Sequence, residues 1–179
     1  MTRVKPYFRT FTGRRVHPLD PMPDEINIFD VARALSHQCR FLGHTSVFYS
    51  VAQHSVHVSH LVPTKDALWG LVHDASEAFL GDLPSPIKRD PEMASYRVAE
   101  DRLMRAVCER YDLPPEMPAS VRLADRVMLA TEFRDITDVA DREWIKNECG
   151  VEPLPHHIEA WLPAVAEAQF MDRFVEVAR

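Results

Sequence analysis

The sequence has few cysteines and no long hydrophobic run. Its three cysteines, Cys39, Cys108 and Cys149, are scattered and include no Cys-x-x-Cys pair, so neither a disulfide framework nor a zinc knot is expected. No stretch approaches the length of a membrane span, and the amino terminus has no apolar segment of the kind found in secretory signals. We therefore expect a cytoplasmic protein with reduced packing cysteines and no membrane partner.

Several motifs of large protein classes are also missing. The sequence contains no Gly-rich phosphate loop, no serine nucleophile elbow, no internal repeat and no low-complexity segment. The net charge is −6, which argues against binding to a nucleic-acid polymer or to an anionic membrane surface. A local basic pocket for one small phosphate group remains compatible with this charge.

What the sequence does contain is a series of helical patterns. The chain has 179 residues, 46% of them hydrophobic and 27% charged, which is typical of a single domain with a substantial core. Apolar residues recur at spacings of three and four, so we predict an all-α bundle of about six or seven helices. The predicted helices cover 28–37, 51–62, 65–79, 91–112, 119–137 and 156–178, with Pro163 kinking or restarting the last one.

The segments between these helices are less regular. Ser50 and Gln53 form a capping-box pattern at the start of the second helix, and Thr64 is a candidate cap for the third. Residues 138–153 are polar and are predicted to be irregular. Residues 1–24 are rich in proline, arginine and aromatic side chains, and they fit either a short hairpin around residues 12–13 or a mobile arm.

The most informative stretch is 72–77, which reads VHDASE. His73 and Asp74 are neighbours and form a mixed nitrogen and oxygen pair suited to a divalent transition metal. Glu77 follows within one helical turn, on the same side, where it could orient or deprotonate a water. An incidental polar edge on a core helix is the alternative. Acidic groups and a histidine in apolar surroundings are costly to bury without a partner, which favours the metal.

Further metal ligands can be proposed from two other helices. The helix 51–62 carries His54, His57 and His60, and spacing alone does not choose among them. Asp125 is embedded in the apolar run of the helix 119–137, where a carboxylate is usually paired or ligating. His156 and His157 are weaker candidates at the expected start of the last helix.

Two basic spots could contact a phosphate group. Arg40 and Phe41 lie in an irregular loop, where they could hold a phosphate and stack on a base, or could belong to an ordinary helix connection. Lys88 follows a proline-rich turn beside the acidic motif and could bind phosphate or be a solvated helix end.

These residues resemble those of the HD-domain phosphohydrolases, whose pattern is a His, then His-Asp, then a distant Asp. The resemblance extends from about residue 34 to residue 131 and is closest to the branch of bacterial 5′-deoxynucleotidases and phage dATP triphosphohydrolases. It depends on the stretches VAQHS at 51–55, HDASE at 73–77, GDLPSPIK at 81–88 and LAD at 123–125. The sequence departs from the commonest form of the branch at Gln53, where Glu is frequent.

The resemblance implies a role for each matching residue. It implies an HD-domain helical bundle, the metal ligands His54, His73, Asp74 and Asp125, Glu77 as general acid or base, and Asp82 as a residue that holds the water or the leaving oxygen. It implies that Arg40 and Lys88 contact phosphate, that Phe41 packs on the base or sugar, and that Pro84 and Ser85 line the nucleoside pocket.

The function implied is metal-dependent hydrolysis of small nucleotides, of monophosphates or of triphosphates. Two imidazoles with two carboxylates accept manganese, iron, cobalt, nickel or zinc, and magnesium could accompany a triphosphate substrate. A guanosine-tetraphosphate hydrolase and a catalytically silent nucleotide-sensing module are the alternatives. Homo-oligomers are common in this family, so a dimer or larger assembly is expected, with the helix carrying Trp161, Phe170 and Phe174 either in the contact or in the core.

Overall fold

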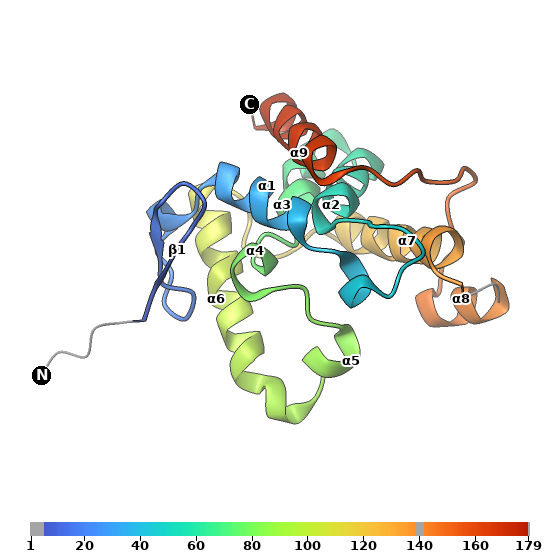
Figure 1. Cartoon of the computed structure of the whole chain (residues 1–179), viewed down its shortest axis with the longest axis horizontal. Helices are drawn as coiled ribbons and strands as arrows, with labels where there is room; N and C mark the ends of the chain where they lie inside the picture. The colour runs from blue at the N-terminus through green and yellow to red at the C-terminus, as the bar shows by residue number, and fades with distance from the viewer. Residues whose placement is uncertain (1–5, 139–141, 179) are drawn as a thin grey trace, which may run out of the picture.

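The protein is mostly helical, as the sequence predicts. The computed structural model describes residues 6–138 and 142–178 (Figure 1). Two short antiparallel strands, β1 (Phe8–Arg9) and β2 (Arg15–Val16), precede the helices. The α-helices are α1 (Ile28–His37), α2 (Val51–Leu61), α3 (Ala67–Val72), α4 (Glu77–Leu80), α5 (Ser85–Lys88), α6 (Ala94–Arg110), α7 (Ala119–Ile136), α8 (Arg142–Cys149) and α9 (Pro163–Val177). Short 3-10 turns lie at η1 (Pro23–Glu25), η2 (Arg40–Gly43), η3 (Thr64–Asp66) and η4 (Pro91–Met93).

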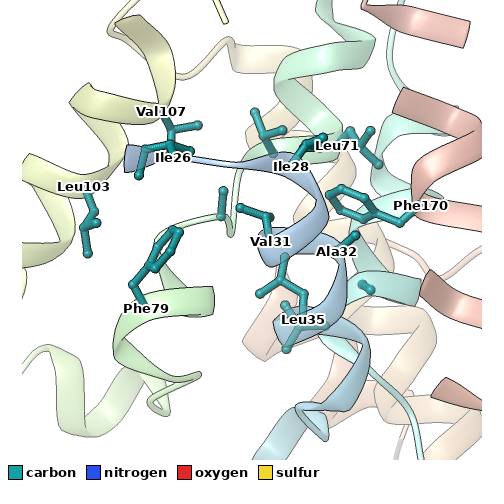
Figure 2. Close-up of a cluster of buried hydrophobic side chains, with 14 of the residues drawn as sticks. Ile26, Ile28, Val31, Ala32, Leu35, Leu71, Phe79, Leu103, Val107 and Phe170 are labelled. Carbon is teal, nitrogen blue, oxygen red and sulfur yellow. The ribbon is translucent and has the colours of Figure 1, made fainter. Parts of the chain in front are cut away.

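Helices α1, α2 and α3 form the centre, α9 packs against them at the top of the view, and α6 lies along one side with α7 and α8 on the other (Figure 1). The apolar stripe of α1 faces side chains from α3, α4, α6 and α9, and Figure 2 shows them meeting around it. Phe170 is fully buried, and Trp161 and Phe174 pack against the same cluster. Phe170 therefore belongs to the core, while Trp161 and Phe174 pack against it and keep part of their surface exposed. Among the described residues, no helix combines the length and apolarity needed to cross a membrane.

The amino-terminal segment forms a hairpin fixed to α1 by one carboxylate. Asp30, which is buried, accepts hydrogen bonds from Thr10 Oγ1 (2.8 Å), Thr12 N (2.8 Å) and Thr12 Oγ1 (2.7 Å). The turn includes Gly13 at φ 81°, a left-handed conformation that glycine adopts without strain. An isolated hairpin is unstable, so these bonds to α1 explain why it forms here. Of the two interpretations of this segment, the hairpin is correct for residues 8–16.

The prediction of one helix over 65–79 is wrong. Helix α3 ends at Val72, and the chain passes through a tight turn before α4 begins at Glu77. The imidazole Nδ1 of His73 lies 2.8 Å from the carbonyl oxygen of Gly70. In a continuing α-helix this oxygen would accept a hydrogen bond from the backbone N–H of Asp74. Thr64 lies in the 3-10 turn η3, and Asp66 rather than Thr64 immediately precedes α3.

The carboxy-terminal region also differs from the sequence prediction. Within the polar segment 138–153, residues 139–141 lie outside the described part of the chain, and the rest contains helix α8, whose Ile145 and Cys149 pack against α7. The last helix begins at Pro163, which occupies its first position, so the expected restart at Pro163 is the true helix start. His156 and His157 lie in an irregular segment before it, and His157 Nδ1 contacts Asp135 at 2.7 Å. All three cysteines are free thiols.

The capping box predicted at α2 is half correct. Ser50 caps the helix by accepting a hydrogen bond from Gln53 N at 3.1 Å. The Gln53 side chain, however, does not return to the cap. Its Nε2 donates to the carbonyl oxygen of Glu159 (2.6 Å), and its Oε1 accepts from Trp161 N (2.8 Å). Gln53 is fully buried, and this paired contact holds the irregular segment before α9 against α2.

We expect Gln53→Glu to lower the free energy of unfolding by about 1–3 kcal/mol, because the buried side chain at this position would become a carboxylate that cannot donate to the carbonyl oxygen of Glu159. Urea unfolding followed by circular dichroism would measure the change. Gln169→Glu, at an exposed position on α9, is the matched control and should change stability little. Equal stabilities for the two variants would show that the amide contact is dispensable.

Candidate metal centre

Three helical regions bring four potential metal ligands together. His54 comes from α2, His73 and Asp74 from the turn after α3, and Asp125 from α7. The two Nε2 atoms of His54 and His73 lie 3.2 Å apart. Asp74 Oδ2 lies 3.3 Å from His73 Nε2 and 3.7 Å from His54 Nε2. Asp125 Oδ1 lies 3.1 Å from His54 Nε2 and 3.9 Å from His73 Nε2.

This donor set fits a single divalent cation. Two atoms bound to one transition-metal ion at about 2.1 Å lie roughly 3.0–3.4 Å from each other, close to most of the separations observed here. His54, His73 and Asp74 alone already place one ligand atom each within 4.8 Å of one another. Both imidazoles are buried, so the nitrogens are shielded from competing water.

In each imidazole, the nitrogen that faces away from the centre, Nδ1, has a hydrogen-bond partner. Nδ1 of His73 lies at the carbonyl of Gly70 (2.8 Å), and Nδ1 of His54 lies 2.6 Å from Glu132 Oε1. A carbonyl oxygen can only accept, so Nδ1 of His73 carries a proton and its Nε2 is left to face the centre. Partners of this kind orient ligating histidines in metal sites and fix their tautomer.

The electrostatics of the centre favour a positive charge. Burial and the Arg40 guanidinium lower the pKa of His54, but the carboxylates of Glu132 and Asp125 outweigh them and raise it to about 10. Burial raises the pKa of Asp125, but its hydrogen bond to His54 and the nearby positive charges lower it overall. The charge between these carboxylates can come from a proton or from a divalent cation.

Glu77, the expected general acid or base, follows Asp74 by three residues and is close enough for the charge of Asp74 to act on it. Its side chain is buried at the start of α4, and Oε1 accepts from Lys88 Nζ at 2.7 Å. Within the described part of the chain, Oε2 is buried and has no hydrogen-bond partner. Burial, followed by the charges of Asp74 and Asp82, raises the pKa of Glu77 well above its usual value, and Lys88 opposes this shift.

Lys88 is held by two carboxylates. Besides Glu77, its Nζ donates to Glu100 Oε1 of α6 at 2.8 Å. Burial lowers the pKa of Lys88, but these two partners outweigh burial and raise it above its usual value, so the side chain is charged. The phosphate contact expected for Lys88 would therefore need its ammonium group to share its donors with the two glutamates.

Asp82 is placed beside Glu77 by the side chain of Gln38. Gln38 Nε2 donates to the Glu77 carbonyl (3.0 Å), and Gln38 Oε1 accepts from Asp82 N (3.0 Å). One amide therefore fixes the relative position of the two predicted catalytic acids. Burial raises the pKa of Asp82, and Arg40 opposes that shift.

Arg40 is buried and reaches the centre from the η2 turn. Its Nε donates to Glu132 Oε2 at 3.0 Å, and its Nη1 lies 3.6 Å from Asp74 Oδ2. The next residues, Phe41 and Leu42, both have φ 54°, a left-handed conformation that costs of order 1–3 kcal/mol for each bulky residue. The Phe41 ring packs on Phe133 with 5.3 Å between centroids.

The remaining predicted residues lie farther along the chain or outside the centre. Pro84 is half-buried just before α5, and Ser85, the first residue of α5, is exposed. Of the three histidines on α2, the structure brings His54 into the centre. His57 instead stacks on Trp161, and burial, followed by the charge of His54, lowers its pKa to about 4.

Comparison with known proteins gives a family but not a function. No protein-family model matches the sequence. The chain is 38% identical to "Uncharacterized protein YfdR" of Escherichia coli over 172 residues, 96% of each chain. It is 35% identical to "Uncharacterized protein RCAP_rcc00048" of Rhodobacter capsulatus over 148 residues, 75% of each chain. The chain belongs to the YfdR family.

Three polar residues of this YfdR-family protein were not found from the sequence. Glu132, Gln38 and Glu100 contact predicted site residues: Glu132 and Gln38 contact residues far away in the sequence, and Glu100 contacts Lys88 from the following helix, α6. A signal existed for Glu132, because it lies seven residues after Asp125, two helical turns along the same face of α7. The sequence gives no comparable signal for Gln38 or Glu100.

Proposed function

We propose that this YfdR-family protein is a metal-dependent phosphohydrolase of small nucleotides, most directly of deoxynucleotides. The observation that supports it is the pair of buried Nε2 atoms 3.2 Å apart, with Asp74 and Asp125 alongside. Glu77, three residues after Asp74, adds a candidate proton acceptor. The resemblance to the HD-domain phosphohydrolases supports the choice of phosphate chemistry and of nucleotides.

The proposed ligands are His54, His73, Asp74 and Asp125. Nitrogen and oxygen donors in this mixture suit manganese, iron, cobalt, nickel or zinc, and magnesium could enter with a triphosphate. A cation held there would polarise a phosphoryl oxygen and make water more acidic, which are the usual contributions of a divalent metal to phosphate hydrolysis.

The residues around the ligands have separate tasks in this proposal. Glu77 takes the proton of the attacking water, which adds to phosphorus without a covalent enzyme intermediate. Asp82, held by Gln38, keeps the water or the leaving oxygen in position. Arg40 and Lys88 offset the negative charge of the phosphate, and Phe41 together with Pro84 and Ser85 contacts the nucleoside.

A substrate panel tests the proposal. Purified protein, stripped of metal and reloaded with each candidate cation, is incubated separately with deoxynucleoside monophosphates, deoxynucleoside triphosphates and guanosine tetraphosphate, and the products are separated by chromatography. We expect inorganic phosphate from dAMP if the protein is a nucleotidase, or triphosphate from dATP if it is a triphosphohydrolase. Cleavage of guanosine tetraphosphate alone would replace the proposal with that activity. Nucleotide binding without hydrolysis would indicate a sensing module.

The homo-oligomeric state and the cytoplasmic location expected from the sequence stay predictions.

A further inference from the structure

We propose that Glu132 is a positioning residue that presents His54 to the cation and ties Arg40 to the same centre. This inference rests on the proposed metal-dependent function, but it concerns two contacts of one buried side chain rather than the substrate. Glu132 lies on α7, outside the set of residues that resemble the HD pattern.

Both carboxylate oxygens of Glu132 make a close polar contact. The side chain has no exposed surface, and Oε1 lies 2.6 Å from His54 Nδ1 while Oε2 accepts from Arg40 Nε at 3.0 Å. A buried carboxylate is costly unless it is paired and hydrogen-bonded. The positive charge of Arg40 and its Nε–H donor meet that condition, so Glu132 is ionised and acts only as an acceptor.

The contact with Glu132 also determines the tautomer of His54. Because an ionised carboxylate cannot donate, the proton between Glu132 and His54 must belong to Nδ1. When His54 is neutral, its lone pair is then on Nε2, the atom that lies 3.2 Å from His73 Nε2 and 3.1 Å from Asp125 Oδ1. Glu132 therefore selects the tautomer that can ligate a cation and fixes the plane of the ring.

Arg40 is held by the same carboxylate. Its Nε is fixed by Glu132, and its Nη1 lies 3.6 Å from Asp74 Oδ2, so one guanidinium bridges Glu132 and a predicted ligand. Glu132 and Asp125 also share one face of the same 18-residue helix. A single rigid element thus supplies a ligand and the residue that orients a second ligand.

The variant Glu132→Gln tests this positioning role, since it keeps the size of the side chain and replaces one acceptor by a donor. If the amide nitrogen faces Arg40, two donors oppose each other. If it faces His54, Nδ1 must accept and the proton moves to Nε2, where it blocks the cation. We expect the affinity for Zn²⁺, measured by isothermal titration calorimetry, to fall roughly 10–100-fold.

Asp135→Asn is the matched control. Asp135 is another carboxylate of α7, with a side chain only 2% exposed, and it contacts Arg134 and His157 away from the centre. We expect this variant to bind Zn²⁺ like the original protein. Equal losses of affinity in both variants, accompanied by equal losses of thermal stability, would show that Glu132 is only structural and would overturn the proposal. Unchanged Zn²⁺ affinity in folded Glu132→Gln would overturn it as well.

A second measurement does not depend on the folding of any variant. In the Zn²⁺-loaded protein, nitrogen-15 NMR should show a slowly exchanging proton on Nδ1 of His54, held by Glu132. A His54 ring without this proton would contradict the proposal even if the metal binds. Failure of the original protein to bind any divalent cation would instead refute the proposed function, so the two failures can be told apart.

Discussion

We expect Asp74→Ala to lose metal and hydrolytic activity together. Asp74 Oδ2 lies near both imidazole nitrogens and 3.6 Å from Arg40 Nη1. Its removal takes away one of the two proposed carboxylate ligands and leaves the charge of Arg40 less compensated beside the centre, which repels a cation. We expect the metal affinity to fall by more than the roughly 100-fold that follows loss of an outer hydrogen-bond partner. Hydrolysis should fall below detection at equal added metal.

The measurement is metal content after dialysis, by plasma mass spectrometry, alongside phosphate release. Asp101→Ala, which removes an exposed carboxylate from α6, is the control and should retain both properties. Circular dichroism shows whether each variant is folded. Full metal occupancy in folded Asp74→Ala would remove Asp74 from the ligand set.

Glu77→Gln keeps the metal and loses turnover. The Glu77 carboxylate is buried, and its Oε1 accepts a hydrogen bond from Lys88. Glu77 is not one of the proposed metal ligands. An amide of the same size cannot take a proton from water, so we expect kcat to fall by roughly 10²-fold or more while metal content stays unchanged. Unchanged turnover in this variant would remove Glu77 from the mechanism.

The control for Glu77→Gln has to separate proton transfer from the effect on Lys88. Glu100→Gln removes the other carboxylate that holds Lys88 and leaves Glu77 in place. If Glu77 acts as the base, the Glu100 variant should change kcat much less than the Glu77 variant does. Similar losses of kcat in the two variants would indicate that Glu77 acts mainly by holding Lys88.

Local signals allowed much of the helical framework to be predicted. Helix α1 occupies the predicted range 28–37, since its apolar spacing and the cap by Asn27 are both encoded within a few residues. Ser50 likewise caps α2 as expected. The pattern failed between residues 65 and 79, because the imidazole of His73 takes the carbonyl of Gly70 and the helix ends there. The spacing of apolar residues cannot predict that a side chain will take the place of a backbone N–H at a carbonyl oxygen.

The candidate site, too, was predictable from the sequence only in part. The sequence by itself determined that His73, Asp74 and Glu77 are close, because neighbours within one turn cannot separate. It also placed His54 and Asp125 on helices with suitable faces. Only the tertiary structure decided that these helices converge, that Glu132 rather than solvent meets His54, and that Lys88 is shared by Glu77 and Glu100. Such pairings depend on how helices pack, and packing is set by the whole core rather than by any one segment.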